Sequence, residues 1–405
     1  MKILILAGGA DQVALIKELQ KRGHETILVD YLDNPPAKKV VDIHIKESTL
    51  DFDKVKEIAV RENVDMICTA CTDQALLTVA KVSEELNLPT YISYEKALSV
   101  TNKAYMKKKM RECEIPTSNY LTISGRKLIP HNLSYPLIVK PADCNSSKGV
   151  VKVRDIDEYN KALEQALILS RTSTAIVEEF VEGDEISADF YIDGYTPIFL
   201  SATKSTKIKG TKGFTITGSI FPVLSNEQQS QLIEIARKIS KGFNISNAPL
   251  LIQLIYAKGE FYVVEFSARM GGGSKYRLIQ EISGVDIMSK YVDLILGTRP
   301  NISPITSKQQ IRMIYVYTIP GKVDKILGLA DLIKGDIVKE AFQYKPLGSV
   351  IDKADTSSDR ILGLLVIARS KEEMNEKIIK INSQLAVLNA LGKDIMRHDL
   401  LVENE

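Results

Sequence analysis

The sequence predicts a mixed fold that is α/β in its first part and α+β in the remainder. Three observations support this prediction: strand and helix patterns alternate up to about residue 95, an apolar hairpin at 250–269 carries polar side chains and ends in three glycines, and residues 301–405 combine strands with a long helix. With 405 residues, 44% of them hydrophobic, the chain has room for two to four domains.

The charge balance, the apolar runs and the cysteines exclude several function classes. A net charge of +2, from 53 basic and 51 acidic residues, gives no electrostatic reason to expect nucleic acid or an anionic membrane as a partner. The apolar start is too brief for a signal peptide, and no apolar run is long enough to span a bilayer, so we expect a soluble, cytoplasmic protein. Four scattered cysteines, Cys68, Cys71, Cys113 and Cys144, are expected to be free thiols, most of them buried.

Residues 1–95 predict a Rossmann-like domain with a parallel sheet. Strands and helices alternate over residues 2–7, 11–23, 25–31, 64–70, 73–87 and 89–93, beginning and ending with a strand. Gly8-Gly9 follows the first strand and Asp30 ends the second, as in a dinucleotide site, but the fingerprint requires three spaced glycines. We favour a degenerate nucleotide fold that holds part of another substrate over a true NAD site.

The chain then changes from helix to strand. One helical segment is expected over Tyr94–Cys113, with Lys103 near its start and a solvated basic run at Lys107–Lys109. Strands at 119–123 and 137–140 follow, and a loop of small polar residues then lies between Lys140 and Lys148. Such a loop can fold backbone amides over phosphate oxygens, although this segment alone is equally compatible with an ordinary hairpin loop.

Acidic residues flank the next pair of strands. After a helix expected at 157–169, two strands are joined by Glu182–Asp184, with Glu178 before the turn and Glu185 after it. An interrupted strand edge offers backbone groups to a purine, and an acid after the turn can accept both ribose hydroxyls. Acidic residues are also frequent at turns, so this motif is of moderate specificity by itself.

The hairpin at 250–273 carries polar groups where apolar ones are expected. If Ala257-Lys258-Gly259 forms a three-residue loop, Gln253 lies opposite Val263 and Glu265 lies one diagonal step away on the same face. Gln253, Glu265, Ser267 and Arg269 then form one polar stripe, whose carboxylate and amide oxygens suit Mg²⁺ or Mn²⁺ bound together with phosphates. The alternative is an edge hairpin whose polar face meets water.

Taken in order, Lys140, the SSKG loop, EEFVEGDE and EFSARMGGG make the chain resemble the ATP-grasp superfamily, which includes biotin carboxylases, carbamoyl-phosphate synthetases, phosphoribosylglycinamide synthetases and amino-acid ligases. The resemblance covers residues 1 to about 300. It implies a two-lobed ATP-grasp fold at 96–300, with a lid at about 118–183, behind the Rossmann-like domain at 1–95. Residues 301–405 would be a small α+β cap, with strands in RMIYVYT and GLLVIAR and a helix at Lys371–Leu391.

The resemblance also implies roles for individual residues. Phosphates of ATP would be bound by Lys103, Lys140 and a closing loop of Ser146, Ser147, Lys148 and Gly149. Adenine would be held by Glu178 and the backbone of Phe180 and Val181, and ribose by Glu185. Gln253 and Glu265 would bind metal and Arg269 the transferring phosphoryl group, while Ser267 stands where the family usually has Asn.

Ser201–Pro222 lies between these motifs and is expected to be an extended hairpin at the mouth of the site, too poor in apolar residues for core strands. Lys204 is its candidate for a γ-phosphate or substrate-carboxylate contact. The helix expected at 227–243 is ordinary packing, with its apolar positions at Leu232, Ile235, Ala236 and Ile239.

The resemblance implies an enzyme that phosphorylates a carboxylate with ATP and joins the acyl phosphate to an amine, releasing ADP and phosphate. Its cofactors would be ATP and two Mg²⁺ (or Mn²⁺) ions, its partners small-molecule carboxylates and amines, and a homodimer is left open. Phosphoribosylglycinamide-synthetase-like or biotin-carboxylase-like activity is an alternative. A protein that binds ATP without turnover is an alternative of another class, favoured by Ser267, and an NAD oxidoreductase ranks third.

Overall fold

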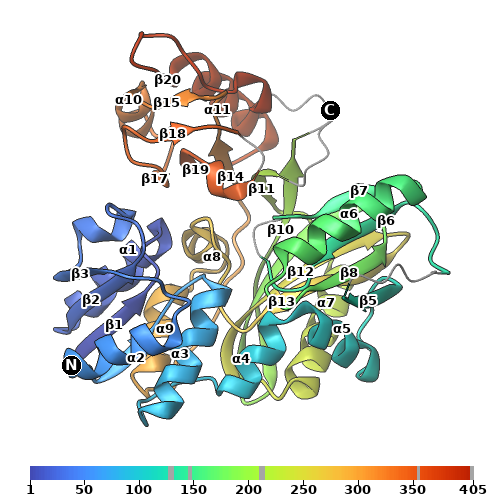
Figure 1. Ribbon diagram of the computed structural model, residues 1–405. Coiled ribbons are helices and arrows are strands. Elements are labelled where there is room, and N and C mark those ends of the chain that lie inside the picture. The colour runs from blue at the N-terminus through green and yellow to red at the C-terminus, as the bar shows by residue number, and fades with distance from the viewer. Residues whose placement is uncertain (126–131, 145–147, 209–214, 354–355, 402–405) are drawn as a thin grey trace.

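The N-terminal domain, a large sheet and the C-terminal domain lie around one short helix. The computed structural model describes residues 1–125, 132–144, 148–208, 215–353 and 356–401. Helix α8 (Lys275–Ser283) lies at the centre, with the N-terminal domain on one side, a large sheet on the other and the C-terminal domain above (Figure 1).

The N-terminal domain is a parallel sheet with strand order β3-β2-β1-β4, as the alternating pattern predicted. Its elements are β1 (Lys2–Leu6), α1 (Ala10–Lys21), β2 (Glu25–Asp30), β3 (Ile43–Lys46), α2 (Phe52–Arg61), β4 (Met66–Cys68) and α3 (Asp73–Glu85). The sequence prediction missed β3 and α2. Strand β3 is a four-residue edge strand that is only half-buried, so its apolar pattern is too short to stand out.

The structure explains the conformation of residues 89–93 and of the turn after β1. Residues 89–93 were predicted to be a strand and form none: Ile92 is buried in the core of the large sheet, and the Tyr91 hydroxyl donates to the Ala268 carbonyl at 3.0 Å. The apolar pattern there reflects docking of an irregular segment. The Asp30 carboxylate accepts hydrogen bonds from the Gly8 and Leu32 N–H groups at 2.7 and 2.8 Å, so it fixes the turn after β1.

The single helix predicted over Tyr94–Cys113 is in fact two, α4 (Tyr94–Thr101) and α5 (Lys103–Glu112). Asn102 between them has extended backbone angles. Its side-chain oxygen accepts hydrogen bonds from the N–H groups of Ala104 and Tyr105 at 3.0 and 3.1 Å, which caps α5. The break turns α5 so that its first residue, Lys103, points into the interior.

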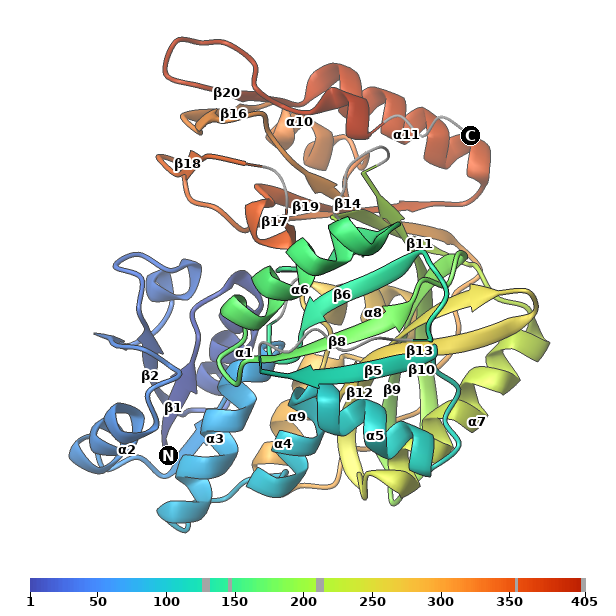
Figure 2. The same ribbon diagram turned by 45° about the vertical axis from the view of Figure 1, so that its right-hand side comes forward.

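A four-stranded antiparallel sheet with order β5-β8-β6-β7 occupies the segment that was expected to form the lid, and we call this sheet the lid. Its strands are β5 (Tyr120–Ser124), β6 (Leu137–Pro141), β7 (Val151–Val153) and β8 (Thr174–Glu179), and α6 (Ile156–Leu169) lies along β6 and β8 (Figure 2). Tyr159, Leu163 and Ala166 of α6 are buried against Val139 and Val177 of the sheet. This apolar stripe explains why the helix predicted at 157–169 is correct.

The large sheet has eight strands in the order β13-β12-β9-β10-β11-β14-β19-β17. Its strands are β9 (Asp184–Asp193), β10 (Thr196–Lys207), β11 (Ile216–Phe221), β12 (Asn247–Ala257), β13 (Glu260–Ser267), β14 (Gln310–Val316), β17 (Glu340–Gln343) and β19 (Leu362–Ala368). Helix α7 (Asn226–Gly242) packs against one face, and its predicted apolar positions at 232, 235, 236 and 239 are confirmed as buried. Helices α8 and α9 (Ile287–Ile295) pack against the other face.

The expectation that Ser201–Pro222 forms no core strands is wrong. Strands β10 and β11 lie in the middle of the large sheet, and Ser201, Thr203, Thr217 and Ser219 are buried. Small hydroxyl side chains occupy this interior because the face they share also carries other polar groups, such as Asp189, which accepts a hydrogen bond from Ser201 at 2.9 Å.

The C-terminal domain is continuous with the large sheet, because β14 pairs with both β11 and β19. Its further elements are β15 (Gly321–Lys322), β16 (Lys325–Leu327), α10 (Leu329–Lys334), β18 (Val350–Ile351), α11 (Lys371–Gln384) and β20 (Ala386–Leu388). The helix predicted to reach Leu391 ends at Gln384, because Leu385 is extended and β20 pairs with β16. In the described part of the chain, no helix has the length and apolarity to cross a bilayer.

Replacing Asn102 with Ala should destabilise the protein by about 1 kcal/mol, because two N–H groups at the start of α5 lose their acceptor. Urea denaturation would measure the change. Asn102→Asp keeps an acceptor oxygen and serves as the control, with stability close to the unsubstituted protein. Equal losses in both variants would show that the cap is not what Asn102 contributes.

Candidate active site

The polar pair Gln253 and Glu265 lies side by side on the large sheet, for a different reason from the one predicted. The loop has two residues, Lys258 and Gly259, both with positive φ, as in a type I′ turn. The predicted three-residue loop and the pairing of Gln253 with Val263 are therefore wrong. The register shifts by one residue between Gln253 and Leu254, a β-bulge that leaves Val264 unpaired and sets Glu265 directly opposite Gln253.

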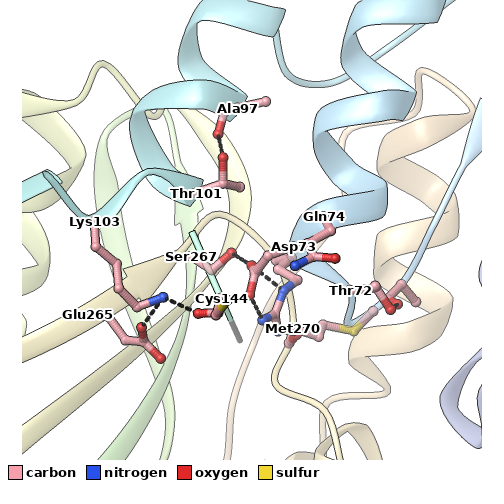
Figure 3. A network of polar contacts seen from close by, with 12 residues as sticks. Thr72, Asp73, Gln74, Ala97, Thr101, Lys103, Cys144, Glu265, Ser267 and Met270 are labelled. Carbon is pink, nitrogen blue, oxygen red and sulfur yellow. Dashed lines mark hydrogen bonds and ion pairs between the residues drawn. The ribbon is translucent and has the colours of Figure 1, made fainter. Parts of the chain in front are cut away.

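Lys103 connects this pair to the lid. Its ammonium lies 3.1 Å from Glu265 Oε2 and donates a hydrogen bond to the Cys144 carbonyl at 2.8 Å, as Figure 3 shows. Burial disfavours the charged form of Lys103, but Glu265 outweighs this effect and the pKa of Lys103 is raised above its usual value. Lys103 thus remains a cation beside the oxygen ligands.

An acid from the N-terminal domain completes the polar stripe. Asp73, at the start of α3, accepts a hydrogen bond from the Ser267 hydroxyl (Figure 3). It is also ion-paired with Arg269, whose Nε lies 2.6 Å from Asp73 Oδ1. Burial alone would raise the pKa of Asp73, but Arg269 reverses this and lowers it. Arg269 therefore faces the site already paired with a carboxylate.

A second buried charge cluster joins the lid to α5. The Glu178 carboxylate is ion-paired with Lys140 and with Lys107, the latter at 2.7 Å, and also accepts a hydrogen bond from Ser118 at 2.9 Å. Burial acts to raise the pKa of Glu178, but the two lysines outweigh it and hold the pKa far below its usual range. The prediction of a solvated Lys107 is wrong, since this side chain is 1% exposed. Burial lowers the pKa of Lys107 despite Glu178.

The remaining predicted nucleotide residues lie outside the two charge clusters described above. Lys148 is exposed and Val181 half-buried, while the Phe180 N–H donates to the Pro136 carbonyl at 2.9 Å. Glu185 is ion-paired with Lys207, and Lys204 lies 2.7 Å from Asp184. Ser146 and Ser147 lie outside the described residues.

Gly149 has a φ of 75°, and a Cβ there would lie 2.8 Å from Leu169 and 2.9 Å from Pro141. The segment after Lys148 therefore requires glycine at this position.

The donor set fits a hard cation. A narrow pocket is lined by polar side chains from α3, α5, β12, β13 and the segment after β13: Asp73, Lys103, Gln253, Glu265, Ser267 and Arg269. Gln253 and Glu265 offer one amide and one carboxylate, and no cluster of three His, Cys, Asp or Glu suited to a metal occurs among the described residues. Two protein oxygens leave most of an octahedral shell to phosphates and water, which is how Mg²⁺ is bound with nucleotides.

Asp73 and Lys107 are the two site residues that the sequence reading missed. Asp73 lies almost two hundred positions before its partners, and an acid in the first turn of a helix is ordinary helix chemistry. Lys107 stands in the run KKK, where only its spacing of four from Lys103 distinguishes it. That spacing is the one signal that places Lys107 on the inward face of α5. All four thiols are free, as predicted, but the expectation that most of them are buried is wrong, because only Cys68 is buried and Cys71, Cys113 and Cys144 are half-buried.

Comparisons with known proteins agree with this geometry. Residues 133–276 match the ATP-grasp domain family. The chain is 23% identical over 291 residues to an L-arginine-specific L-amino acid ligase of Bacillus subtilis (69% of this chain, 70% of the relative) and 24% identical over 426 residues to a phosphoribosylamine–glycine ligase of Methanosarcina barkeri (99% and 96%). The solved structure of an L-amino acid ligase from Bacillus licheniformis superposes with a TM-score of 0.79 at 21% identity, covering 96% of this chain and 98% of that one.

Replacing Glu178 with Gln should destabilise the fold by about 3–5 kcal/mol, because two buried ammonium groups lose their counter-charge. The depressed pKa of Glu178 means that its ionised form stabilises the fold above the usual value of 4.5, and this contribution is lost as the pH falls. The difference in unfolding free energy between the unsubstituted protein and Glu178→Gln should therefore shrink from about pH 7 to about pH 3 in urea titrations.

The exposed Glu164 of α6 provides the control, and Glu164→Gln should change stability by less than about 0.5 kcal/mol. A difference between the unsubstituted protein and Glu178→Gln that stays constant with pH would argue against this ion-pair assignment.

Proposed function

We propose, from the premise that this chain belongs to the ATP-grasp superfamily, that it is an ATP-dependent ligase that joins a carboxylate to an amine. The supporting observation is the convergence of Lys103, Arg269 and the pair Gln253–Glu265 on one pocket between helices α3 to α5 and the large sheet. Cations and oxygen ligands arranged in this way suit phosphoryl transfer, in which catalysis is mostly positioning and charge neutralisation.

Lys103 and Lys140 bind the phosphates of ATP, and Lys148 and Gly149 close over them together with Ser146 and Ser147. Both buried lysines are paired with acids, Glu265 and Glu178, which hold the ammonium groups in place before the nucleotide arrives. The phosphate oxygens then take over part of this pairing. Preorganised cations of this kind do not have to reorient during the reaction.

Adenine lies against Glu178 and the backbone of Phe180 and Val181, and ribose against Glu185. Because the Phe180 N–H is bonded to Pro136, its carbonyl is the group that remains for the exocyclic amine of adenine. Lys204 and Arg269 contact the transferring phosphoryl group or the substrate carboxylate.

Gln253 and Glu265 would hold Mg²⁺, with Ser267 beside a second ion, and the metal would supply neutralisation of the phosphate charge. The carboxylate attacks the γ-phosphorus, the bond from that phosphorus to the bridging oxygen breaks, and ADP leaves. The amine then displaces orthophosphate from the acyl phosphate.

The names of the relatives suggest substrates. The L-amino acid ligase and the phosphoribosylamine–glycine ligase both carry an amino acid in their names. We therefore take an amino acid as the first carboxylate to test. Phosphoribosylglycinamide-synthetase-like and biotin-carboxylase-like activities, and ATP binding without turnover, are the other outcomes of that test.

With ATP, Mg²⁺ and each of the L-amino acids as carboxylate, the protein should release ADP and orthophosphate and form a hydroxamate when hydroxylamine is the amine. Phosphorus NMR identifies the products, because AMP and pyrophosphate would instead indicate adenylate chemistry and remove the basis for the role of Arg269. Binding of ATP by calorimetry with no turnover under any condition would favour the non-catalytic alternative.

Ser267→Asn should lower the Mg²⁺ concentration that gives half-maximal activity, because an amide oxygen reaches further than a hydroxyl and binds a hard cation better. The Asn side chain has to displace the Asp73 carboxylate, which Ser267 now contacts. Ser267→Ala, which adds no oxygen, is the control and should not lower the Mg²⁺ requirement. If the Mg²⁺ titration of Ser267→Asn is unchanged, position 267 is not a ligand position.

A further inference from the structure

A second group of polar side chains is buried on the same face of the large sheet, next to the Gln253–Glu265 pair. It comprises Ser187 and Asp189 of β9, Ser201 and Thr203 of β10, and Lys275 at the start of α8, each less than a tenth exposed. We call these five residues the inner cluster. No nucleotide or metal role assigned above uses any of them.

The inner cluster is incompletely paired. Lys275 donates a hydrogen bond to the Ser187 hydroxyl but lies 3.8 Å from Asp189 Oδ2, which is occupied by Ser201 at 2.9 Å. Asp189 Oδ1 and the Thr203 hydroxyl have no hydrogen-bond partner among the described residues. A buried polar atom without a hydrogen-bond partner destabilises the fold by about 1–3 kcal/mol. Two such atoms in the inner cluster therefore indicate a binding site for a ligand.

The register of the strands places the inner cluster beside the candidate metal ligand Gln253. Gln253 pairs with Ser187, and Ser187 pairs with Thr203, while Leu251 and Ser201 flank Asp189 two residues further along. Asp189 is therefore a diagonal neighbour of Gln253, at about 7–8 Å between Cα atoms.

Gly271 makes room for the side chain of Lys275. A Cβ on Gly271 would lie 2.7 Å from Cδ of Lys275 and 3.6 Å from Leu251, so only glycine allows Lys275 to cross toward β9. The inner cluster thus lies between the candidate metal ligands and the N-terminus of α8, where Figure 1 shows the three domains meeting.

We propose that Asp189 receives the ammonium group of the amine substrate and accepts its proton, and that Lys275 contacts the oxygens of the acyl group being attacked. This inference rests on the proposed ligase function and identifies the amine as a protonated primary amine, such as the amino group of an amino acid. A buried carboxylate oxygen with no donor suits an ammonium group, and a hydroxyl such as Thr203 can accept a second N–H.

The reaction of the amine with the acyl phosphate conserves atoms, electrons and protons. The ammonium loses one proton to Asp189 Oδ1, and its nitrogen lone pair then attacks the acyl carbon to form the C–N bond. The bond from that carbon to the phosphate oxygen breaks, and orthophosphate leaves with the electron pair. Of the other two protons, one leaves with orthophosphate and one stays on the amide, and Asp189 returns its proton to solvent.

The electrostatics of the inner cluster support a base at this position. Burial raises the pKa of Asp189, although Lys275, Ser201 and Arg269 all act to lower it, and burial also lowers the pKa of Lys275. A carboxylate with a raised pKa accepts a proton more readily than an exposed one.

Asp189→Asn separates the two half-reactions. Hydroxylamine is unprotonated at neutral pH and requires no base, so hydroxamate formation from ATP and an L-amino acid should persist in this variant. Amide formation with a second L-amino acid as the amine should fall by about 10²–10⁴-fold, the usual contribution of a general base. Asp193→Asn at the far end of β9, where Asp193 is ion-paired with Arg299 at the surface, should leave both reactions unchanged.

Equal losses of hydroxamate and amide in a folded Asp189→Asn protein would overturn the proposal and leave the inner cluster as structural. Absence of hydroxamate in the unsubstituted protein with every L-amino acid would instead count against the proposed function itself.

If Asp189→Asn does not fold, Ser201→Ala provides the second test. It removes the hydroxyl that donates to Asp189 and should raise the pKa of that carboxylate. The acid limb of amide formation should then move to higher pH, while Lys275 and Arg269, which also face Asp189, are unchanged. An unmoved limb would contradict the role of Asp189.

Discussion

The candidate site depends on one extra residue in one strand. With a two-residue turn and no bulge, Gln253 would lie opposite Val264, and Glu265 would face the other side of the sheet. The bulge at Val264 returns Glu265 to the face of Gln253. At the same place, the Val263 N–H donates to the Pro116 carbonyl at 2.8 Å, and the Val263 carbonyl accepts from Thr117 at 2.7 Å. The segment that leads into the lid is therefore attached to the strand that carries Glu265.

The hydrogen bonds at this attachment continue into a cluster of buried charged side chains. Thr117 accepts a hydrogen bond from Lys107, which pairs with Glu178, so the bulge, helix α5 and the lid share one set of contacts. Four cations face three acids in the site: Lys103, Lys107, Lys140 and Arg269 against Asp73, Glu178 and Glu265. The excess positive charge matches the phosphates of a nucleotide, and the acids offset the cost of burying the cations without one.

Local chemistry was readable from the sequence, whereas contacts between distant segments were not. The apolar positions of α7 and the helix α6 follow from periodicity alone, which is why their prediction was accurate. The pairing of Asp73 with Arg269 joins two domains, and no local pattern encodes it. The bulge was not predicted, because the expected three-residue loop also places Gln253 and Glu265 on one face of the sheet. The predicted face was therefore correct, although the predicted turn was not. The prediction for β10 and β11 was wrong because their hydroxyl side chains suggested exposure to solvent, although the sheet buries these side chains.

The segment between β13 and α8 explains why a C-terminal domain without a chemical motif belongs to the site. Asp11 of the N-terminal domain accepts hydrogen bonds from the N–H groups of Gly273 and Ser274, while Tyr315 of β14 donates to the Gly273 carbonyl at 2.9 Å. A Cβ on Gly273 would lie 2.6 Å from that tyrosine oxygen. The backbone that carries Arg269 at one end and Lys275 at the other is thus clamped from both outer domains. The positions of these two cations therefore depend on hydrogen bonds to both outer domains.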